Sequence, residues 1–177
     1  VRAEQLIGRI ESILPQPLSA PDWDAAIAWR YRKRSNGHGV LEPVRHVAAM
    51  RLSDLQEIDA QKDKIVRNTE QFVQGRPANN VLLTGARGTG KSSLVKACLN
   101  AFAAQGLRLI EMDKSDLTDL PDIVEVVAAR PEKFIVFCDD LSFEDGEPGY
   151  KALKSILDGS VAAATPNVLI YATSNRR

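Results

Sequence analysis

The sequence predicts an α/β protein in which helices cover both faces of a parallel β-sheet. From residue 80 onward, short apolar runs alternate with stretches of helical spacing, which is typical of strand–helix–strand units. Each run is apolar throughout, as expected of a strand that is buried on both faces. One run leads directly into a glycine-rich loop at residues 85–92. We therefore expect a three-layer fold.

The composition is that of an ordinary globular domain. The 177 residues are 44% hydrophobic and 26% charged, with a formal net charge of zero, so no global field points to nucleic acid or to an anionic membrane. No apolar stretch approaches the roughly 20 residues that span a bilayer. Cys98 and Cys138 lack the spacing of a metal or redox motif. We expect two buried, reduced thiols in a cytoplasmic protein with no membrane partner.

We assign residues 1–51 to a helical N-terminal segment and linker, and residues 52–177 to the α/β core. Apolar residues at helical spacing predict a first helix over residues 2–14, which Pro15 ends. Asp22 is expected to cap a second, short helix. The apolar side of that helix would carry Trp23, Ile27 and Trp29.

A basic run follows at residues 30–34, where Tyr31 lies among arginine and lysine side chains. Two interpretations stay open for this run. Together with Trp29, it is a candidate surface for stacking against nucleic acid. Alternatively, it is the solvated face of an amphipathic helix, or it meets an acidic neighbour.

The predicted core is an ordered series of helices and strands. Apolar side chains at helical spacing predict a helix from Asp54 to Gly75, which ends it. Strands are expected at residues 80–84, 107–112, 134–138 and 168–173, and further helices at residues 92–104, 121–129 and 149–157. Because helices separate the strands, the sheet should be parallel.

The loop at residues 85–92 has the sequence GARGTGKS and matches the phosphate-binding motif G-x-x-x-x-G-K-[ST] in full. Its glycines let successive backbone N–H groups converge on phosphate oxygens, and the helix that follows points its positive dipole end at the same place. Lys91 is expected to contact the β- and γ-phosphates, and Ser92 to bind Mg²⁺. The pattern predicts a P-loop NTPase. Its candidate ATP-binding residues are Gly85, Ala86, Arg87, Gly88, Thr89, Gly90, Lys91, Ser92 and Ser93.

Polar residues follow two of the predicted strands. Asp139 and Asp140 come after the strand at residues 134–138, which we expect to lie beside the strand that leads into the phosphate loop. Asp139 would then hold Mg²⁺, directly or through water, and Asp140 would orient or deprotonate the attacking water. Asn175 follows the strand at residues 168–173, and it is expected to donate a hydrogen bond to the γ-phosphate or to the same water.

These three elements, in this order, resemble the core of an AAA+ ATPase over residues 52–177. Residues 85–92 match the Walker A motif, residues 134–140 the Walker B motif, and Asn175 the sensor-1 residue. In that family a segment ahead of the core packs against adenine, which implies a base contact for Ile58. The stretches NNVLLTGARGTGKSSLVKA, FCDDLSFEDGEPGYKALKSILDGS and NVLIYATSNRR are similar to a family of predicted bacterial AAA+ ATPases described as a domain of unknown function.

The resemblance implies an ATPase that uses ATP and Mg²⁺, with Lys91, Asp140 and Asn175 as its catalytic residues. It also implies a homo-oligomer when the protein is full length, and a protein or nucleic-acid partner that the sequence does not identify. The family pattern continues past sensor 1 with a fifth strand, an arginine finger and a helical lid. We therefore expect residues 52–177 to be an incomplete nucleotide-binding core, truncated after the sensor-1 strand. Arg176 and Arg177 come too early to be that finger.

Two functional hypotheses follow. The first is ATP hydrolysis coupled to the remodelling of a macromolecule. Many AAA+ proteins carry Asp-Glu where this chain carries Asp139 and Asp140, and the shorter Asp140 has farther to reach; helicase-loader-like proteins also carry Asp-Asp. The alternative is a slowly hydrolysing switch or loader, in which nucleotide binding gates a partner interaction. A GTPase is disfavoured because the sequence has no Asn-Lys-x-Asp motif, and no lid or acceptor-site sequence supports a small-molecule kinase.

Overall fold

The computed structural model describes residues 2–13, 17–47, 49–55, 59–86, 88, 90–141, 148–157 and 166–175. The strands are β1 (Ala28–Lys33), β2 (Gly39–Pro43), β3 (Val81–Thr84), β4 (Leu107–Met112), β5 (Lys133–Cys138) and β6 (Val168–Ser174). Within these residues they form one six-stranded sheet in the order β2-β1-β4-β5-β6-β3. Only β1 and β2 pair antiparallel; every other neighbouring pair in the described sheet is parallel.

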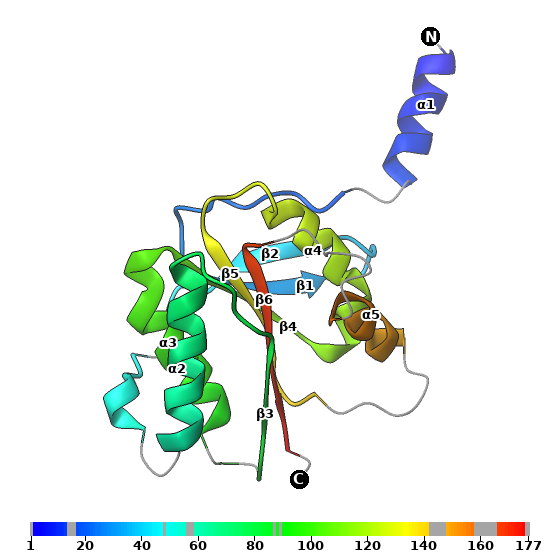
Figure 1. The fold of residues 1–177 in the computed structure, drawn as a ribbon. Coiled ribbons are helices and arrows are strands. Elements are labelled where there is room, and N and C mark those ends of the chain that lie inside the picture. Colours follow the sequence, from blue (N-terminus) through cyan, green and yellow to red (C-terminus); the bar gives the residue numbers. More distant parts are fainter. Residues whose placement is uncertain are drawn as a thin grey trace.

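Helices cover both faces of this sheet. The described helices are α1 (Arg2–Ile13), α2 (Asp59–Val73), α3 (Lys91–Phe102), α4 (Leu120–Val127) and α5 (Pro148–Leu157), with short 3-10 turns η1 (Leu52–Asp54), η2 (Ala103–Gln105) and η3 (Lys114–Asp119). Of the five α-helices, α2 to α5 pack against the sheet. Side chains of α2 and α3 pack on one face, and those of α4 and α5 pack on the other (Figure 1). The predicted three-layer α/β architecture is confirmed. None of the helices described here has both the length and the apolar character that crossing a bilayer requires.

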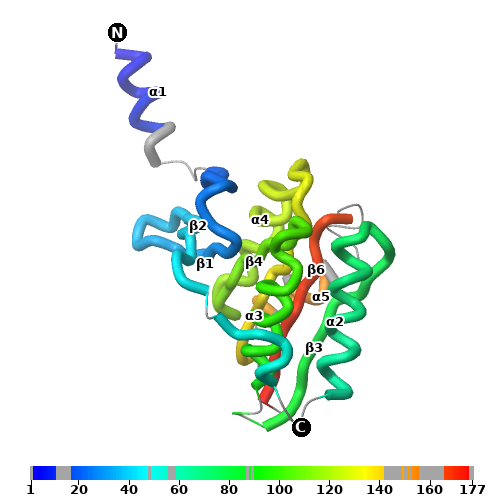
Figure 2. Tube along the Cα trace, turned by 90° about the vertical axis from the view of Figure 1, so that its left-hand side faces the viewer, coloured from blue at the N-terminus to red at the C-terminus, as the bar shows by residue number. Residues whose placement is uncertain are grey.

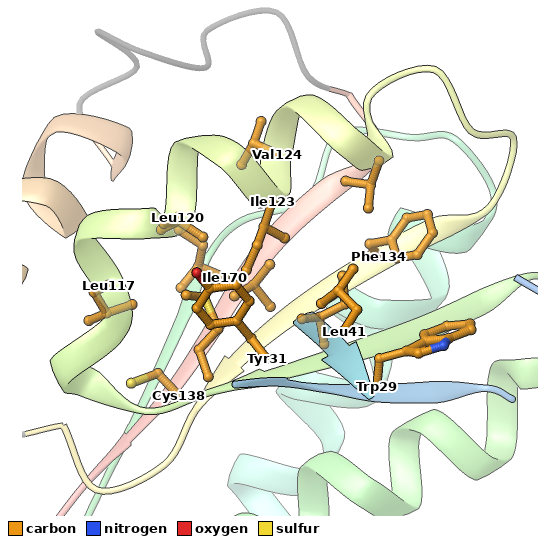
Figure 3. Packing of buried hydrophobic residues seen from close by; sticks show 14 of the residues in the cluster. Trp29, Tyr31, Leu41, Leu117, Leu120, Ile123, Val124, Phe134, Cys138 and Ile170 are labelled. Carbon is orange, nitrogen blue, oxygen red and sulfur yellow. The ribbon is translucent and has the colours of Figure 1, made fainter. Parts of the chain in front are cut away.

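Two apolar clusters, one on each face of the sheet, form the core. The cluster under α4 contains Trp29, Phe134 and Ile170 (Figure 3). The indole of Trp23 meets the rings of Trp29 and Phe134 edge-on, with centroids 5.1 and 5.2 Å apart, which is a favoured aromatic geometry. The cluster under α2 and α3 is built around side chains such as Phe72. Each cluster draws on alternate residues of the central strands, which explains why those strands are apolar throughout.

Both cysteines are buried in these clusters, as expected. Cys98 belongs to α3 and to the cluster on that face, and Cys138 belongs to the cluster on the opposite face of the sheet. Burial raises the pKa of both thiols to about 12. They are therefore protonated packing residues at neutral pH.

The second helix that we expected after Asp22 is wrong. Asp22 Oδ1 accepts the N–H of Asp24 at 3.0 Å, and the Asp22 carbonyl accepts the N–H of Ala25 at 3.1 Å. These bonds form a local turn, which an aspartate favours as readily as a helix start. The chain then extends into β1.

Within β1 the side chains alternate between the two faces. Trp29 and Tyr31 are buried, whereas Arg30 and Arg32 are exposed. This is the period of two that a strand requires. Because both aromatic rings lie in the core, the interpretation of this run as a stacking surface for nucleic acid is wrong. The exposed arginines instead face acidic neighbours, which was part of the second interpretation.

The β1–β2 hairpin makes residues 28–43 part of the main sheet. One sheet therefore extends across the predicted division between residues 51 and 52. The hairpin is closed by a turn around Gly37, which has φ of +81°. Gly39 serves a different purpose, because a Cβ atom there would overlap the ring and hydroxyl of Tyr31. That hydroxyl donates a 2.7 Å hydrogen bond to Asp119.

The strand order corrects a further expectation. We expected β5 to lie beside β3, but β6 lies between them and pairs with both. Figures 1 and 2 show β6 alongside β3. A crossover connection between parallel strands is long enough to skip a position in the sheet, so adjacency in space does not follow from order along the chain. β6 is thus the immediate neighbour of both β3 and β5.

Candidate functional site

The start of α3 depends on two glycines. Gly88 and Gly90 both have φ of +83°, a backbone region that glycine adopts at little cost. Gly90 is the N-cap residue of α3, and its carbonyl accepts the N–H of Leu94 at 2.9 Å. The first turn of α3 thus follows this loop directly, and the N-terminus of a helix favours an anion.

Lys91 is buried at the base of this loop. Its Nζ donates hydrogen bonds to the carbonyl oxygens of Gly85 and Ala86, at 2.9 and 2.8 Å, and the side chain is only 6% exposed. A buried ammonium is costly unless it is hydrogen-bonded, and the loop backbone supplies these bonds. The loop thus holds a positive charge in a fixed place.

Three oxygen-bearing side chains meet where α3 faces the ends of β5 and β6. Ser92 Oγ donates to Asp139 Oδ1 at 2.7 Å, and Thr173 Oγ1 donates to the same carboxylate oxygen. Burial alone would raise the pKa of Asp139, but the hydrogen bonds from Ser92, Thr173 and the Asp140 backbone outweigh burial and hold the pKa below its ordinary value. Asp139 is therefore ionised at neutral pH.

Asp140 has an unusual backbone conformation. Its φ is +56°, in the left-handed region that costs a residue with a side chain about 1 kcal/mol or more. Its N–H donates to Thr173 Oγ1 at 2.9 Å, and its Oδ1 accepts the amide of Asn175 at 2.8 Å. Both candidate catalytic groups at the ends of β5 and β6 are thus in direct contact.

These residues surround one cleft of about 370 Å³. Its lining consists of Gly88, Gly90, Lys91, Ser92, Ser93, Asp139, Asp140, Thr173 and Asn175. A hollow of similar size, about 400 Å³, lies at the opposite ends of the strands and includes Arg76 and Lys133. That second hollow has no carboxylate among its described lining residues, whereas the first combines carboxylates with a lysine.

The donor set suits Mg²⁺. Mg²⁺ prefers oxygen ligands, takes one or two from the protein, and completes its shell with phosphate oxygens and water. Ser92 Oγ and Asp139 Oδ1 offer two such oxygens 2.7 Å apart at the edge of the cleft. In the part of the chain that is described, no group of three or more His, Cys, Asp or Glu side chains could hold a metal by itself. Phosphate oxygens and water would supply the remaining ligands of a Mg²⁺ ion held here.

The structure brings together most of the residues that the sequence singled out. Gly88, Gly90, Lys91, Ser92, Ser93, Asp139, Asp140 and Asn175 line the cleft. Gly85 and Ala86 lie at its base through their contacts with Lys91. Arg87, Thr89, Ile58, Arg176 and Arg177 lie outside the described residues, so the predictions for them stay predictions.

Sequence reasoning missed Thr173. The available signal was a polar residue at the end of an otherwise apolar strand, two positions before Asn175. The register explains its role in the site, because Cys138 pairs with Ala172 and the next position puts Asp139 beside Thr173. The prediction considered the residues after each strand separately, whereas the side chain that joins them is the second-to-last residue of β6 itself.

The sheet order, the glycine loop before α3 and the polar ends of β5 and β6 define a P-loop NTPase fold of the AAA+ type, as the resemblance implied. The chain belongs to the family described as "Protein of unknown function (DUF815)", whose model matches residues 24–177. That match includes the β1–β2 hairpin as well as the cleft. No curated protein matches the chain.

Solved structures share the fold. AMPPCP-bound DnaA from Aquifex aeolicus aligns with a TM-score of 0.51 at 18% identity, over 73% of this chain and 43% of that one. The ORC1 protein of Aeropyrum pernix, in complex with DNA, gives a TM-score of 0.51 at 14% identity, over 67% and 38%. A DNA replication initiation factor gives 0.50 at 18% identity, over 71% and 41%. The chain thus spans about two fifths of the length of these structures, and the likeness concerns the fold.

Proposed function

We propose that this chain binds Mg-ATP in the cleft at the start of α3 and hydrolyses it. The observation that carries the proposal is the 2.7 Å contact between Ser92 and the ionised Asp139, beside the buried ammonium of Lys91. A metal-binding pair of oxygens and a fixed cation at a helix N-terminus suit a polyphosphate bound to a divalent cation. The first-turn N–H groups of α3 add further donors to the phosphate oxygens.

The residues divide the work of binding. Lys91 would exchange its carbonyl contacts for β- and γ-phosphate oxygens, and Ser92 and Asp139 would hold Mg²⁺. When bound, Mg²⁺ neutralises charge that develops on the phosphates. Ser93 lies at the cleft wall next to Ser92, and Ile58 is proposed to contact the base.

Hydrolysis needs a group that orients or deprotonates water. We assign this role to Asp140, because it follows the metal ligand directly and lines the cleft. Asn175 donates to Asp140 Oδ1 at 2.8 Å, and we propose that its amide contacts the γ-phosphate or the same water when nucleotide is bound. Electrostatic stabilisation by such fixed donors is commonly the largest part of phosphoryl-transfer catalysis.

A second candidate function is a slowly hydrolysing switch or loader. The observation that favours it is the same Asp140–Asn175 hydrogen bond, because one oxygen of the candidate base is occupied by an amide. Water activation by Asp140 would require that amide to move or the second oxygen to act. Slow turnover would then time a partner interaction.

The wider biology is proposed from the family resemblance. We propose a homo-oligomeric form of the full-length protein and a protein or nucleic-acid partner that nucleotide binding controls. The fold is shared with DnaA and with ORC1, whose structures contain AMPPCP and DNA respectively. The present chain spans about two fifths of their length, and the proposed nucleotide site lies within that part.

The test compares full-length protein with Lys91→Ala and with Lys151→Ala as a matched control. Lys151 is an exposed lysine on α5, away from the cleft lining. Titration with a fluorescent ATP analogue measures binding, and release of inorganic phosphate measures turnover. We expect Lys91→Ala to lose at least about tenfold in affinity, because it removes a buried charge from the phosphates, and Lys151→Ala to match the unmodified protein. Equal binding by all three proteins would refute a nucleotide site at this loop.

Turnover separates the two candidate functions. The first candidate function is ATP hydrolysis coupled to remodelling of a macromolecule. It would be supported by hydrolysis at about 1 s⁻¹ or faster, in the range typical of enzymes, and by loss of that hydrolysis in Asp140→Asn. Tight binding with turnover far below that rate, and a partner captured only in the ATP-bound form of Asp140→Asn, would support the switch.

A further inference from the structure

A single buried hydroxyl on β6 contacts both residues of the carboxylate pair that follows β5. The Thr173 side chain is 1% exposed. Its Oγ1 donates to Asp139 Oδ1, and the same oxygen accepts the backbone N–H of Asp140 at 2.9 Å. The Thr173 carbonyl also accepts the N–H of Leu141 at 2.6 Å. Three consecutive residues after β5 are thus tied to one residue of β6.

The conformation of Asp140 makes this tie necessary. Within the described residues, Asp140 is the only non-glycine residue with a positive φ, and such a conformation persists where surrounding contacts fix it. The bond from Asp140 N–H to Thr173 Oγ1 sets the plane of the peptide between Asp139 and Asp140. This peptide joins the Cα atoms of Asp139 and Asp140. The orientation of its plane therefore affects the direction in which both carboxylate side chains project.

Packing does not explain a threonine at this place. The two residues before it on β6, Tyr171 and Ala172, belong to the apolar core. A valine would fill nearly the same volume and would avoid the cost of burying a hydroxyl. The hydroxyl is therefore explained by the groups that it bonds.

We propose that Thr173 is a positioning residue, whose hydroxyl aims Asp139 at the metal and holds Asp140 toward the cleft. This inference rests on the proposed Mg-ATP site and deepens it. The hydroxyl acts through Asp139 and Asp140 and is not assigned a contact with the nucleotide. Residues that orient a metal ligand in this way commonly alter metal affinity by about 10- to 100-fold when they are replaced.

The experiment measures how nucleotide binding depends on Mg²⁺. A fluorescent ATP analogue is titrated into full-length protein at a series of Mg²⁺ concentrations, and once with EDTA. The variants are Thr173→Val, which removes the hydroxyl but keeps the shape, and Thr173→Ser, which keeps the hydroxyl. We expect Thr173→Val to need about 10- to 100-fold more Mg²⁺ for half-maximal enhancement, with binding in EDTA unchanged, and Thr173→Ser to stay close to the unmodified protein.

The matched control is Thr69→Val. Thr69 is an equally buried threonine on α2, where its hydroxyl bonds Tyr171 and the Ile65 carbonyl outside the cleft. We expect this variant to lower the melting temperature and to leave the Mg²⁺ dependence unchanged. Should Thr173→Val fail to fold, Thr173→Ala removes the same hydroxyl without adding a methyl group in its place.

The outcomes distinguish this inference from the function on which it rests. Failure of the unmodified protein to bind the analogue with Mg²⁺ would overturn both. Normal binding by the unmodified protein, with the same Mg²⁺ dependence in Thr173→Val or with equal losses in Thr173→Ser, would overturn the positioning role alone.

Discussion

The carboxyl ends of β5 and β6 and the β1–β2 hairpin both bring charged side chains into contact, but in different surroundings. In the hairpin, Arg32 and Glu42 lie 2.8 Å apart, with 56% and 45% of their side chains exposed. At the ends of β5 and β6, the hydrogen bonds to Asp139 converge on a carboxylate beside the buried Thr173. The distances are alike, but both partners of the hairpin pair are exposed, whereas exposed Asp139 has one buried partner, Thr173.

Exposure decides how much each contact contributes. Water screens the hairpin pair and competes for both partners, so such pairs contribute between about 0 and 1 kcal/mol. At the ends of β5 and β6, Asp139 and Asp140 are themselves exposed, and the group that is shielded from water is the Thr173 hydroxyl. A buried hydroxyl loses more by breaking its hydrogen bonds than water returns, so this group holds its geometry. We infer that the hairpin is anchored by its buried rings and that the cleft is shaped by its polar groups.

Replacing the main ring of the hairpin should have the largest effect. Trp29 is fully buried and contacts Trp23, so Trp29→Ala leaves a cavity and should cost about 3–5 kcal/mol of unfolding free energy. Urea unfolding followed by circular dichroism measures this loss. A cost below about 1 kcal/mol would show that the hairpin is not anchored by its rings.

Asp139→Asn should come next, and should act on activity rather than on folding. The amide cannot supply the negative charge that Mg²⁺ requires, so we expect Mg²⁺-dependent ATP hydrolysis to fall by about 10²- to 10³-fold. Phosphate release at saturating ATP measures the change. Glu42→Gln makes the same chemical change in the hairpin and should leave the rate as it was. A comparable loss in both variants would contradict the assignment of Asp139.

Tyr31→Phe tests an intermediate case within the hairpin. It removes the hydrogen bond to Asp119 and keeps the ring, while Lys33 remains 3.2 Å from the same carboxylate. We expect a loss of about 1 kcal/mol in unfolding free energy. The measurement is again urea unfolding, and an unchanged midpoint would show that water replaces the tyrosine hydroxyl at Asp119.

Arg32→Ala should have the smallest effect. It removes the exposed pair with Glu42, and we expect a change below about 1 kcal/mol that shrinks further in 1 M salt. A thermal melt at low and high salt would show it. A larger, salt-independent loss would mean that exposed charges stabilise the hairpin after all, and the contrast between the two regions would disappear.

The site was more predictable from the sequence than the hairpin, for a physical reason. Two short segments carry the predicted site: the loop before Lys91, and the pair Asp139 and Asp140. In each, the order of residue types follows from the chemistry predicted for it, which is phosphate binding for the loop and metal binding with water activation for the pair. The β1 strand contains six residues, and its alternation is hidden because Trp23 and Ile27 just before it also fit a helical spacing. Residues 28–33 adopt the extended form because they pair with β4 and with β2, which begins at Gly39.

The order of the strands in the sheet and the role of Thr173 could not be predicted from the sequence, for a different reason. Both depend on contacts between segments that are far apart in the chain, such as Asp139 with Thr173, 34 positions later. No spacing within either strand specifies which neighbour it pairs with. The sequence was sufficient to predict the polar residues at the ends of β5 and β6. The contact between the two strand ends, which Thr173 makes, was found only in the structure.

The two glycines of the hairpin turn are constrained in different ways. Gly37 is required by its backbone angle but has open space around it, so asparagine or aspartate, which enter the left-handed region more readily than other side chains, should be accepted there. Gly39 is required by the ring of Tyr31, so every larger residue should be rejected, whatever its backbone preference. In a library of all substitutions, larger residues at position 39 should be tolerated only when the residue at position 31 is also made smaller. Tolerance at position 37 should not depend on the residue at position 31. Such paired tolerance would identify the hairpin in this family from sequence variation alone.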